Sequence, residues 1–274
     1  MIIKTLVENT SISDNYKCEH GLSLYIETEV HKLLFDLGQK DLFIENAAKM
    51  KIDLSQVDTV IISHGHYDHG GGLSEFLKIN DKAKIYLQEK AFDKHYSLRT
   101  EDTSANIGLD EALKSNDRLV FNTGYLKIDD ELELFAGVKG NELLSLSNKT
   151  LLMETEEGIK EDTFEHEQSL IITEAGKQVL IAGCAHKGIV NIVKHAISLK
   201  GRAMERIISG FHLYNPSTKI PEAPELVEQI AEMLNLTGSG YYTCHCTGLE
   251  AYSILKKVMN ENIKYMATGS EILI

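Results

Sequence analysis

The amino-acid sequence predicts a mixed α/β protein. Three observations support this fold class. The first part of the chain alternates short β-type runs with turns, and residues 57–62 form a continuous apolar, β-branched run typical of a buried strand. From residue 186 onward, segments with helical periodicity alternate with short strand-like runs. This alternation predicts sheet faces that are covered by helices.

The individual elements follow from the spacing of apolar residues. Strands are expected over 2–7, 22–27, 31–35, 57–62, 84–87, 118–121, 126–135, 169–173, 178–182, 206–209, 241–244 and 263–267, and helices over 41–50, 73–77, 189–199, 224–234 and 249–260. Residues 174–177 are expected to close a hairpin, with Gly176 supplying a permissive backbone position. The polar region 94–116 is interpreted as a surface insertion or lid with helical pieces. No repeat or low-complexity linker divides the chain, so we expect a single domain over 1–274.

Charge and composition narrow the classes of partner. The chain carries 28 Lys and Arg against 41 Asp and Glu, a formal net charge of −13, which repels polyanions. Long nucleic acid is therefore disfavoured, and a nuclease with it, because no cluster of Lys and Arg could follow a phosphate backbone. The apolar runs fall far short of the ~20 residues of a membrane span, and the amino terminus lacks the features of a secretory signal. We expect a soluble, cytoplasmic protein with a small-molecule substrate, no nucleic acid and no membrane partner, and with its four cysteines reduced.

The strongest chemical signal directly follows the apolar run 57–62. Residues 63–72 read SHGHYDHGGG and offer four candidate metal ligands, His64, His66, Asp68 and His69. Imidazole and carboxylate suit borderline divalent ions such as Zn²⁺, and the glycines let the loop fold tightly. In an extended segment, His64, His66 and Asp68 would share one face while the next residue turns away, which suits two adjacent metal positions. A coincidental, solvated histidine-rich loop is the alternative interpretation.

Several motifs resemble those of the metallo-β-lactamase superfamily, whose signature is H-x-H-x-D-H at the end of a strand. They are EHGLS at 19–23, LFDLG at 34–38, the loop at 63–72, GCAH at 183–186, GFHL at 210–213 and CHCTG at 244–248. The motifs are most similar to a branch that includes a synthase joining a pterin to a ribosyl-aminobenzene phosphate. The resemblance implies a four-layer αβ/βα sandwich of two mixed sheets, with helices on the outer faces and metals at one edge.

The resemblance also implies further metal ligands. His186 and His245 correspond to the later ligands of the family, and Cys184 stands where a bridging carboxylate is expected. A thiolate binds Zn²⁺ strongly, but a cysteine at the end of a buried strand is also ordinary core packing, so both interpretations of Cys184 remain open. Asp36 is expected to accept the second ring N–H of a metal-bound histidine. Cys244 and Cys246 point to opposite sides of an extended chain and are interpreted as packing residues.

Other candidates surround this centre. Asp68 is expected to act in catalysis as well as in metal binding. His212 follows the strand 206–209 and should emerge at the same edge as a proton donor or substrate contact, with an ordinary turn histidine as the alternative. Glu19, His20 and His166 are candidates for positions behind the ligands or facing the substrate. The remaining histidines in ordinary polar contexts are treated as background: His31, His95 and His195.

The function expected from these residues is a metal-dependent hydrolase. Two divalent ions, Zn²⁺ first and Mn or Fe as alternatives, would activate a water for attack on a small phosphoester or related acidic substrate. His212 could protonate the leaving group. One alternative is a synthase or transferase that joins a pterin-type and a ribosyl-aminobenzene-phosphate-type substrate, because the fold does not decide between these reactions. An alternative of another class is a metal-binding sensor without turnover.

Overall fold

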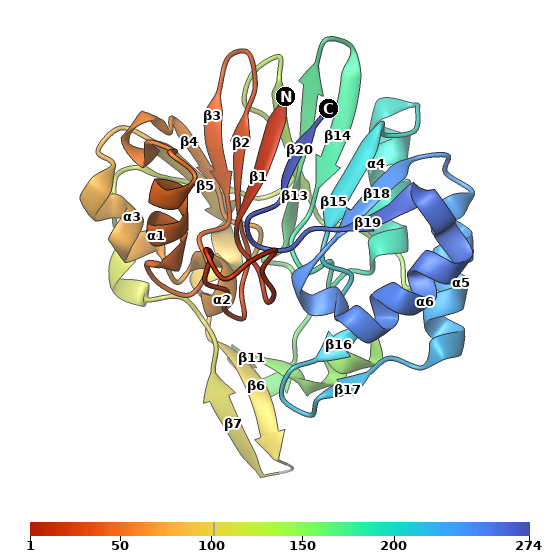
Figure 1. The fold of residues 1–274 in the computed structure, drawn as a ribbon. Helices are drawn as coiled ribbons and strands as arrows, with labels where there is room; N and C mark the ends of the chain where they lie inside the picture. Colours follow the sequence, from red (N-terminus) through yellow and green to blue (C-terminus); the bar gives the residue numbers. More distant parts are fainter. Residues whose placement is uncertain (101) are drawn as a thin grey trace.

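The computed structural model describes residues 1–100 and 102–274 and contains two seven-stranded sheets that pack face to face (Figure 1). The first sheet has the order β20 (Glu271–Leu273), β1 (Ile2–Val7), β2 (Ser23–Glu27), β3 (Lys32–Phe35), β4 (Thr59–Ile61), β5 (Lys84–Gln88) and β8 (Leu119–Asn122). The second has the order β19 (Ile263–Tyr265), β18 (Gly240–Thr243), β15 (Arg206–Ser209), β14 (Lys177–Ile181), β13 (Gln168–Glu174), β10 (Leu132–Ala136) and β9 (Leu126–Lys127). Each sheet is mixed.

Helices cover the outer face of each sheet (Figure 1). The helices α1 (Leu42–Lys49) and α3 (Leu73–Ile79) lie on the first sheet, and α4 (Ile189–Lys200), α5 (Pro224–Asn235) and α6 (Leu249–Met259) lie on the second. The one-turn helix α2 (Tyr67–Gly70) lies at the edge of the sandwich. Short 3-10 helices are η1 (Leu54–Gln56), η2 (Glu89–Phe92), η3 (Glu111–Leu113), η4 (Leu146–Thr150), η5 (His245–Thr247) and η6 (Asn260–Asn262). The expected four-layer αβ/βα sandwich is therefore confirmed.

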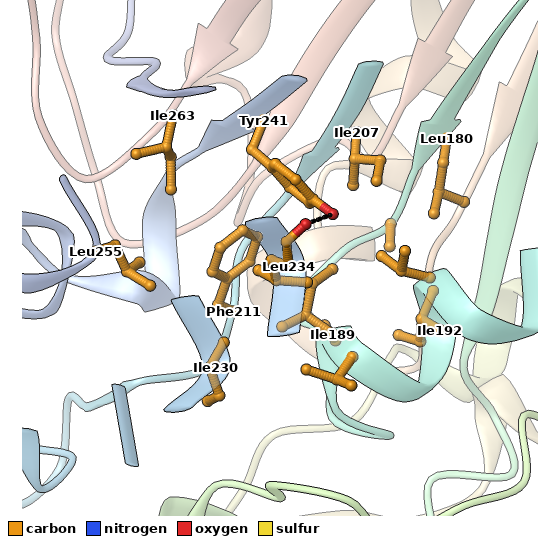
Figure 2. Packing of buried hydrophobic residues seen from close by; sticks show 14 of the residues in the cluster. Leu180, Ile189, Ile192, Ile207, Phe211, Ile230, Leu234, Tyr241, Leu255 and Ile263 are labelled. Carbon is orange, nitrogen blue, oxygen red and sulfur yellow. Dashed lines mark hydrogen bonds between the residues drawn. The ribbon is translucent and has the colours of Figure 1, made fainter. Parts of the chain in front are cut away.

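Three apolar clusters hold these layers together. One lies between the sheets and joins residues such as Phe35 of β3 to Ile181 of β14. The other two lie between each sheet and its helices. Figure 2 shows the cluster under α4, α5 and α6, in which the Tyr241 hydroxyl donates to the backbone oxygen of Leu234 at 3.1 Å. Strands apolar on both faces are what a sandwich covered by helices requires.

The register of the parallel strands brings several loops to one edge of the sandwich. Phe35 pairs with Ile61 in parallel register, so Asp36 and Ser63 emerge close together beyond the ends of β3 and β4. In the second sheet, β14, β15 and β18 are also parallel. Because the carboxyl ends of parallel strands meet at one edge, the loops that follow these strands converge there.

Two small sheets extend this edge (Figure 1). One has the order β12 (Gly158–Glu161), β11 (Leu151–Thr155), β6 (His95–Thr100) and β7 (Thr103–Asn106), and the other pairs β16 (Tyr214–Asn215) with β17 (Ile220–Pro221). Region 94–116 was expected to contain helical pieces, but its described residues form the β6–β7 hairpin and only the short η3; residue 101 lies outside the described residues. The local sequence pattern of this segment is weak, and pairing with β11 gives β6 its strand conformation.

Most of the other expected elements are present with small changes in their bounds. The hairpin between β13 and β14 is confirmed, and its two turn residues Ala175 and Gly176 have φ of 50° and 78°, as a type I′ turn requires. The strand expected over 126–135 is divided, because the Asp129 carboxylate accepts the backbone N–H groups of Glu131 and Leu132 and forms a turn. Among the described residues, every helix is too short or too polar to cross a bilayer.

Candidate metal centre

The loop after β4 is shaped by glycines that have no room for a side chain. A Cβ on Gly65 would lie 2.3 Å from the backbone oxygen of Ala91, and one on Gly71 would lie 2.3 Å from the oxygens of Gln39 and Tyr67. Both contacts are closer than atoms can approach. The loop therefore packs directly against neighbouring backbone, which turns its histidines inward.

The first candidate donor set consists of His64, His66 and His186. The Nε2 atom of His64 lies 3.0 Å from Nδ1 of His66, and the donor atoms of all three residues lie within 4.8 Å of one another. All three side chains are buried. His186 follows β14, so this set joins the ends of strands from both sheets.

The second candidate set consists of Asp68, His69 and His245. The Nε2 atoms of His69 and His245 lie 3.2 Å apart, and Asp68 Oδ2 lies 3.8 Å and 3.4 Å from them, respectively. The expectation that Asp68 shares a face with His64 and His66 is wrong. The backbone bends at His64 and Gly65 and then turns into α2 after His66, which moves Asp68 to the side of His69.

The three buried cysteines have different surroundings. Cys184 Sγ lies 3.1 Å from Nε2 of His69, so it borders the second donor set. Cys244 lies in the core between the sheets, as expected of a packing residue. Cys246 instead lines the cavity at the site, where its sulfur accepts the backbone N–H of His212 at 3.2 Å. The packing interpretation therefore holds only for Cys244.

Asp36 and Ser63 orient two of the histidines. Asp36 Oδ2 lies 2.6 Å from Nδ1 of His69 and also accepts the Ser63 hydroxyl at 2.7 Å. Because that hydroxyl hydrogen is used, the Ser63 oxygen accepts from Nδ1 of His64, at 2.8 Å. Both histidines then carry hydrogen on Nδ1 and direct Nε2 into the site. The Asp36 carboxylate lies where the sequence led us to expect it.

Two amides orient the other histidines in the same way. Nδ1 of His245 lies 2.8 Å from Oδ1 of Asn9, and Nδ1 of His186 lies 3.1 Å from Oδ1 of Asn148. Neither amide was singled out in the sequence. The backbone N–H of His186 also donates to Glu167 at 2.7 Å, which holds the turn after β14. Nε2 of both histidines therefore points toward the site.

The donor sets fit divalent metal ions. Tetrahedral Zn²⁺ with nitrogen ligands at 2.0–2.1 Å separates those nitrogens by about 3.4 Å, close to the 3.0 Å and 3.2 Å seen here. Two lone pairs at such distances repel unless a proton or a cation lies between them. In addition, Nε2 of His186 is buried without any hydrogen-bond partner among the described residues. A buried imidazole nitrogen with no partner points to a ligand that binds there.

The electrostatics of the two sets differ. Burial and the neighbouring histidines lower the pKa of His64 well below its usual value of 6.5, and burial likewise lowers that of His186. Both are therefore neutral and able to donate a lone pair. Burial alone would also lower the pKa of His69, but the carboxylates of Asp36 and Asp68 raise it to about 9. A metal at the second set thus displaces a proton from His69.

A second layer of buried polar residues lies behind His66; His166, a candidate for such a position, belongs to it, whereas Asp162 and His95 were not singled out in the sequence. The Asp162 carboxylate is 2.9 Å from Nδ1 of His95 and 3.1 Å from Nε2 of His166. Nδ1 of His166 in turn accepts the N–H of Gly65 at 2.9 Å. His95, treated above as background, is fully buried in this layer. No local signal marks it, because 67 residues separate it from Asp162.

Of the remaining candidate residues, two line the cavity beside the donor sets and one does not. His20 lines the cavity with its Nε2 3.1 Å from Asp68 Oδ2. Glu19 does not line the cavity; its carboxylate accepts the N–H of Gln39 at 3.1 Å. His212 lines the cavity, its ring 4.3 Å from that of His186, and neither of its ring nitrogens has a hydrogen-bond partner among the described residues. His212 is therefore free to contact a bound molecule.

Both donor sets open into one cavity of about 290 Å³ at the edge of the sandwich. Its walls include Ser97 and Arg99 of β6 on one side and Asn215 and Ser217, from the β16–β17 turn, on another. This volume is near the lower limit for pockets that hold small organic ligands. The site therefore suits a small molecule.

Comparison with known proteins decides the family. Residues 16–195, more than half of the chain, match the family model described as Metallo-beta-lactamase superfamily. The chain belongs to this superfamily. It is 27% identical to the 7,8-dihydropterin-6-methyl-4-(β-D-ribofuranosyl)-aminobenzene-5′-phosphate synthase of Methanocaldococcus jannaschii over 98% of this chain and 95% of that one. An uncharacterized protein of the same organism is also 27% identical, over 94% and 95%.

Solved structures agree with this assignment. The crystal structure of Tm1679, described as a metal-dependent hydrolase of the β-lactamase superfamily, superposes with a TM-score of 0.83 and 29% identity, covering 100% of this chain and 99% of that one. The human short-form tRNase Z, at 12% identity and a TM-score of 0.55 over 100% and 99%, shares the fold alone. The same sandwich thus occurs in proteins that are named for different activities.

Proposed function

We propose that this chain is a metal-dependent hydrolase that acts on a small phosphoester or a related acidic substrate. The observation that carries the proposal is the meeting of two metal-donor sets at one cavity that also contains His212, whose ring nitrogens have no partner among the described residues. The first set would hold one ion through His64, His66 and His186. The second would hold another through Asp68, His69 and His245, with Cys184 as a further candidate ligand. Zn²⁺ suits these donors best, and Mn or Fe are alternatives.

Each group has a distinct role in this proposal. When bound, the metals supply Lewis acidity for a phosphoryl oxygen and lower the pKa of water from about 15.7 toward about 7. His212, which lines the cavity, would transfer a proton to the leaving group. His20 donates toward Asp68 and holds that carboxylate beside His69 and His245. Asp36 keeps His69 in the tautomer that offers Nε2.

The size of the cavity and the charge of the molecule favour a small substrate over nucleic acid. A cavity of about 290 Å³ accommodates a compact molecule. The formal net charge of −13 opposes the approach of a polyanion. A salt-sensitive shift of RNA or DNA in a gel would contradict this part of the proposal.

Elemental analysis of the purified protein, combined with a panel of phosphomonoesters and phosphodiesters, tests the proposal. We expect about two equivalents of metal per chain and turnover of at least one panel member. His66→Ala and His69→Ala should each lose metal and activity together. Full activity of a metal-free double variant would refute the metal mechanism. Tight metal binding with no turnover of any substrate class would instead favour a sensor.

A synthase is the second candidate function. The relative of 27% identity that covers almost the whole chain is named as a synthase, and its named product carries a phosphate. Such a reaction would use the same donor sets to stabilise charge without water as the nucleophile. Incubation in ¹⁸O-labelled water separates the two reactions. A hydrolase incorporates the label into its product, whereas a synthase joins a pterin-type compound to its acceptor without incorporating label.

A further inference from the structure

The cavity contains one cationic side chain that the metal chemistry does not use. Among its lining residues in the described part of the chain, Arg99 is the single Lys or Arg. Arg99 extends from β6 and lines the same cavity as Asp68 and His245 of the second donor set. The arginine and the second donor set therefore border one space.

Arg99 is bonded to a hydroxyl and, among the described residues, to no carboxylate. Its Nη1 donates to the Oγ of Ser217, whose oxygen also lies 3.3 Å from the Oγ of Ser97. A guanidinium has five N–H donors, and this contact uses one of them. In a protein with 41 acidic residues, a cavity arginine bonded to a serine instead of a carboxylate is positioned to receive an anion from outside the chain.

Counting hydrogens shows that the two serines also offer a donor. Ser97 and Ser217 have two hydroxyl hydrogens, and the bond between them uses one, whichever residue donates it. The contact between Ser217 and Arg99 uses no serine hydrogen, because Ser217 accepts there. The second hydroxyl hydrogen therefore has no acceptor among the described residues. Both serines line the cavity. The pair therefore presents one free O–H beside the guanidinium.

Strand pairing and side-chain hydrogen bonds hold the two serines of this group in place. Ser97 lies on β6, where it pairs with Leu151 of β11. Ser217 lies in a turn in which the Asn215 side chain accepts the N–H of Ser217 at 2.9 Å and donates to the Thr150 hydroxyl at 3.1 Å. Because the Asn215 amide is occupied in this way, it orients Ser217 and leaves the anion contacts to the other residues. Donors fixed before binding lose little entropy when a ligand arrives.

We propose that Arg99, Ser97 and Ser217 form a subsite for a second anionic group of the substrate, a carboxylate or a phosphate monoester that does not react. The reacting group would lie at the two metal-donor sets, while the remote anion accepts hydrogen bonds from the guanidinium and the free hydroxyl. The inference rests on the proposed function and narrows it to substrates with an anion at each end. The planar fork of Arg99 matches both carboxylate and phosphate.

Matched ligands test the subsite independently of turnover. Alkyl phosphonates of graded chain length, ending in a carboxylate, a phosphate monoester or a methyl group, are titrated into the zinc-loaded protein by calorimetry. We expect at least one chain length at which an anionic end binds about tenfold to hundredfold more tightly than the methyl end, the range for charged hydrogen bonds. In Arg99→Gln this preference should fall to about twofold or less.

Two further variants complete the comparison. Lys94→Gln removes the same charge from the start of the same hairpin, but Lys94 lies outside the cavity and pairs with Glu154 at 3.0 Å. It should keep the preference for the anionic end. Arg99→Lys retains the charge without the fork, and it should restore part of the preference lost in Arg99→Gln. Equal loss in Lys94→Gln and Arg99→Gln would show only a general field effect and overturn the subsite.

The subsite and the proposed function can fail separately. If the wild type turns over phosphoesters but prefers the anionic end at no chain length, the subsite is wrong and the hydrolase proposal stands. If it turns over none of the panel yet prefers the anionic end through Arg99, the subsite stands and the proposed reaction is wrong. The better of the two anionic ends identifies the group that the natural substrate carries.

Discussion

Asp36 lies at the centre of a chain of contacts that runs from the backbone to the metal-donor sets. Its carboxylate accepts the backbone N–H of Ser63 at 2.7 Å, the Ser63 hydroxyl, and Nδ1 of His69 at 2.6 Å. Its own backbone has φ of 61°, a left-handed conformation that Asn and Asp tolerate better than most residues. Asn is therefore the substitution that preserves the fold best while removing the charge.

Asp36→Asn should weaken metal binding about tenfold to hundredfold, the range for partners of metal-bound histidines. The reason is that a neutral amide accepts less strongly from His69 and no longer fixes its tautomer as firmly. Competition with a chromophoric chelator measures the affinity. Asp14→Asn makes the same chemical change at an exposed residue and serves as the control. Unchanged affinity in a folded Asp36→Asn would mean that the contact is only structural.

Substitution of single cysteines distinguishes the two thiols at the site. Cys184 touches Nε2 of His69, whereas Cys246 accepts the N–H of His212. With Co²⁺ in place of the native metal, a coordinated thiolate gives a charge-transfer absorption. We expect Cys184→Ser to abolish this band and Cys246→Ser to retain it. The reverse result would assign the ligand to Cys246, and the absence of the band in the wild type would exclude both.

Among single residues, the sequence predicted site residues that stand together in one motif. It did not predict residues that meet the site from distant parts of the chain. His64, His66, Asp68 and His69 stand together in the sequence, and the density of ligand types made them visible. Nothing local distinguishes Asn9, which meets His245 from 236 residues away. Partners of this kind depend on tertiary packing, which a single sequence does not display.

The elements that wall the cavity are joined through one buried carboxylate. Glu222, directly after β17, accepts the Ser145 hydroxyl at 2.6 Å and both the N–H and the hydroxyl of Ser147, at 2.8 and 3.0 Å. Ser145 precedes η4 and Ser147 lies within it, and the same helix carries Asn148 against His186. The Glu222 contacts thus fix one wall of the site.

Glu222→Ala should destabilise the protein by about 1–3 kcal/mol, because it leaves buried donors without an acceptor. Hydrogen exchange should increase most over residues 145–150, since those donors belong to that segment. Urea denaturation and exchange mass spectrometry measure the two effects. Glu228→Ala, an exposed position of α5, should stay within about 0.5 kcal/mol of the wild type. Faster exchange across the entire molecule, instead of this segment, would contradict the local role.

Elements with strong periodicity were predicted well, and weakly patterned ones were not. The strand 206–209 was predicted with its observed bounds, because Ile207 and Ile208 form an apolar, β-branched pair typical of a buried strand. The β6–β7 hairpin was missed, since its polar residues gain their strand conformation by pairing with β11, more than fifty residues later. Tertiary pairing, not local preference, decides such segments.

At the scale of the molecule, one histidine links the two sheets at their far end. His31, in the turn between β2 and β3, lies 2.9 Å from Asp58, which precedes β4, and 2.7 Å from Asp129, which precedes β10. Burial would lower the pKa of His31, but the two carboxylates raise it above 6.5. The protonated form is thus bound more tightly in the folded protein.

This link makes part of the stability depend on pH. A raised folded pKa means that the contribution is fully present below the unfolded pKa of about 6.5 and is lost as the pH rises through the folded value. His31→Gln should therefore cost about 0.5–1 kcal/mol near pH 6, after allowance for solvent screening, and almost nothing near pH 9. Urea unfolding at each pH measures the difference. His195, whose pKa is lowered by burial, should give the opposite trend in His195→Gln. A His31→Gln difference that grows with pH would contradict the assignment.

The contact between His245 and Asn9 also bears on the order in which the protein is made. The backbone N–H of His245 donates to Glu8, 237 residues earlier, so this donor is held by the beginning of the chain. The second donor set exists only after the ribosome has added His245, whereas all three residues of the first set are present once His186 has been added. Nascent chains stalled between these lengths should therefore be able to take up one ion and not the other. The number of ions bound by a stalled nascent chain would then indicate whether His245 has been added and has folded against Glu8 and Asn9.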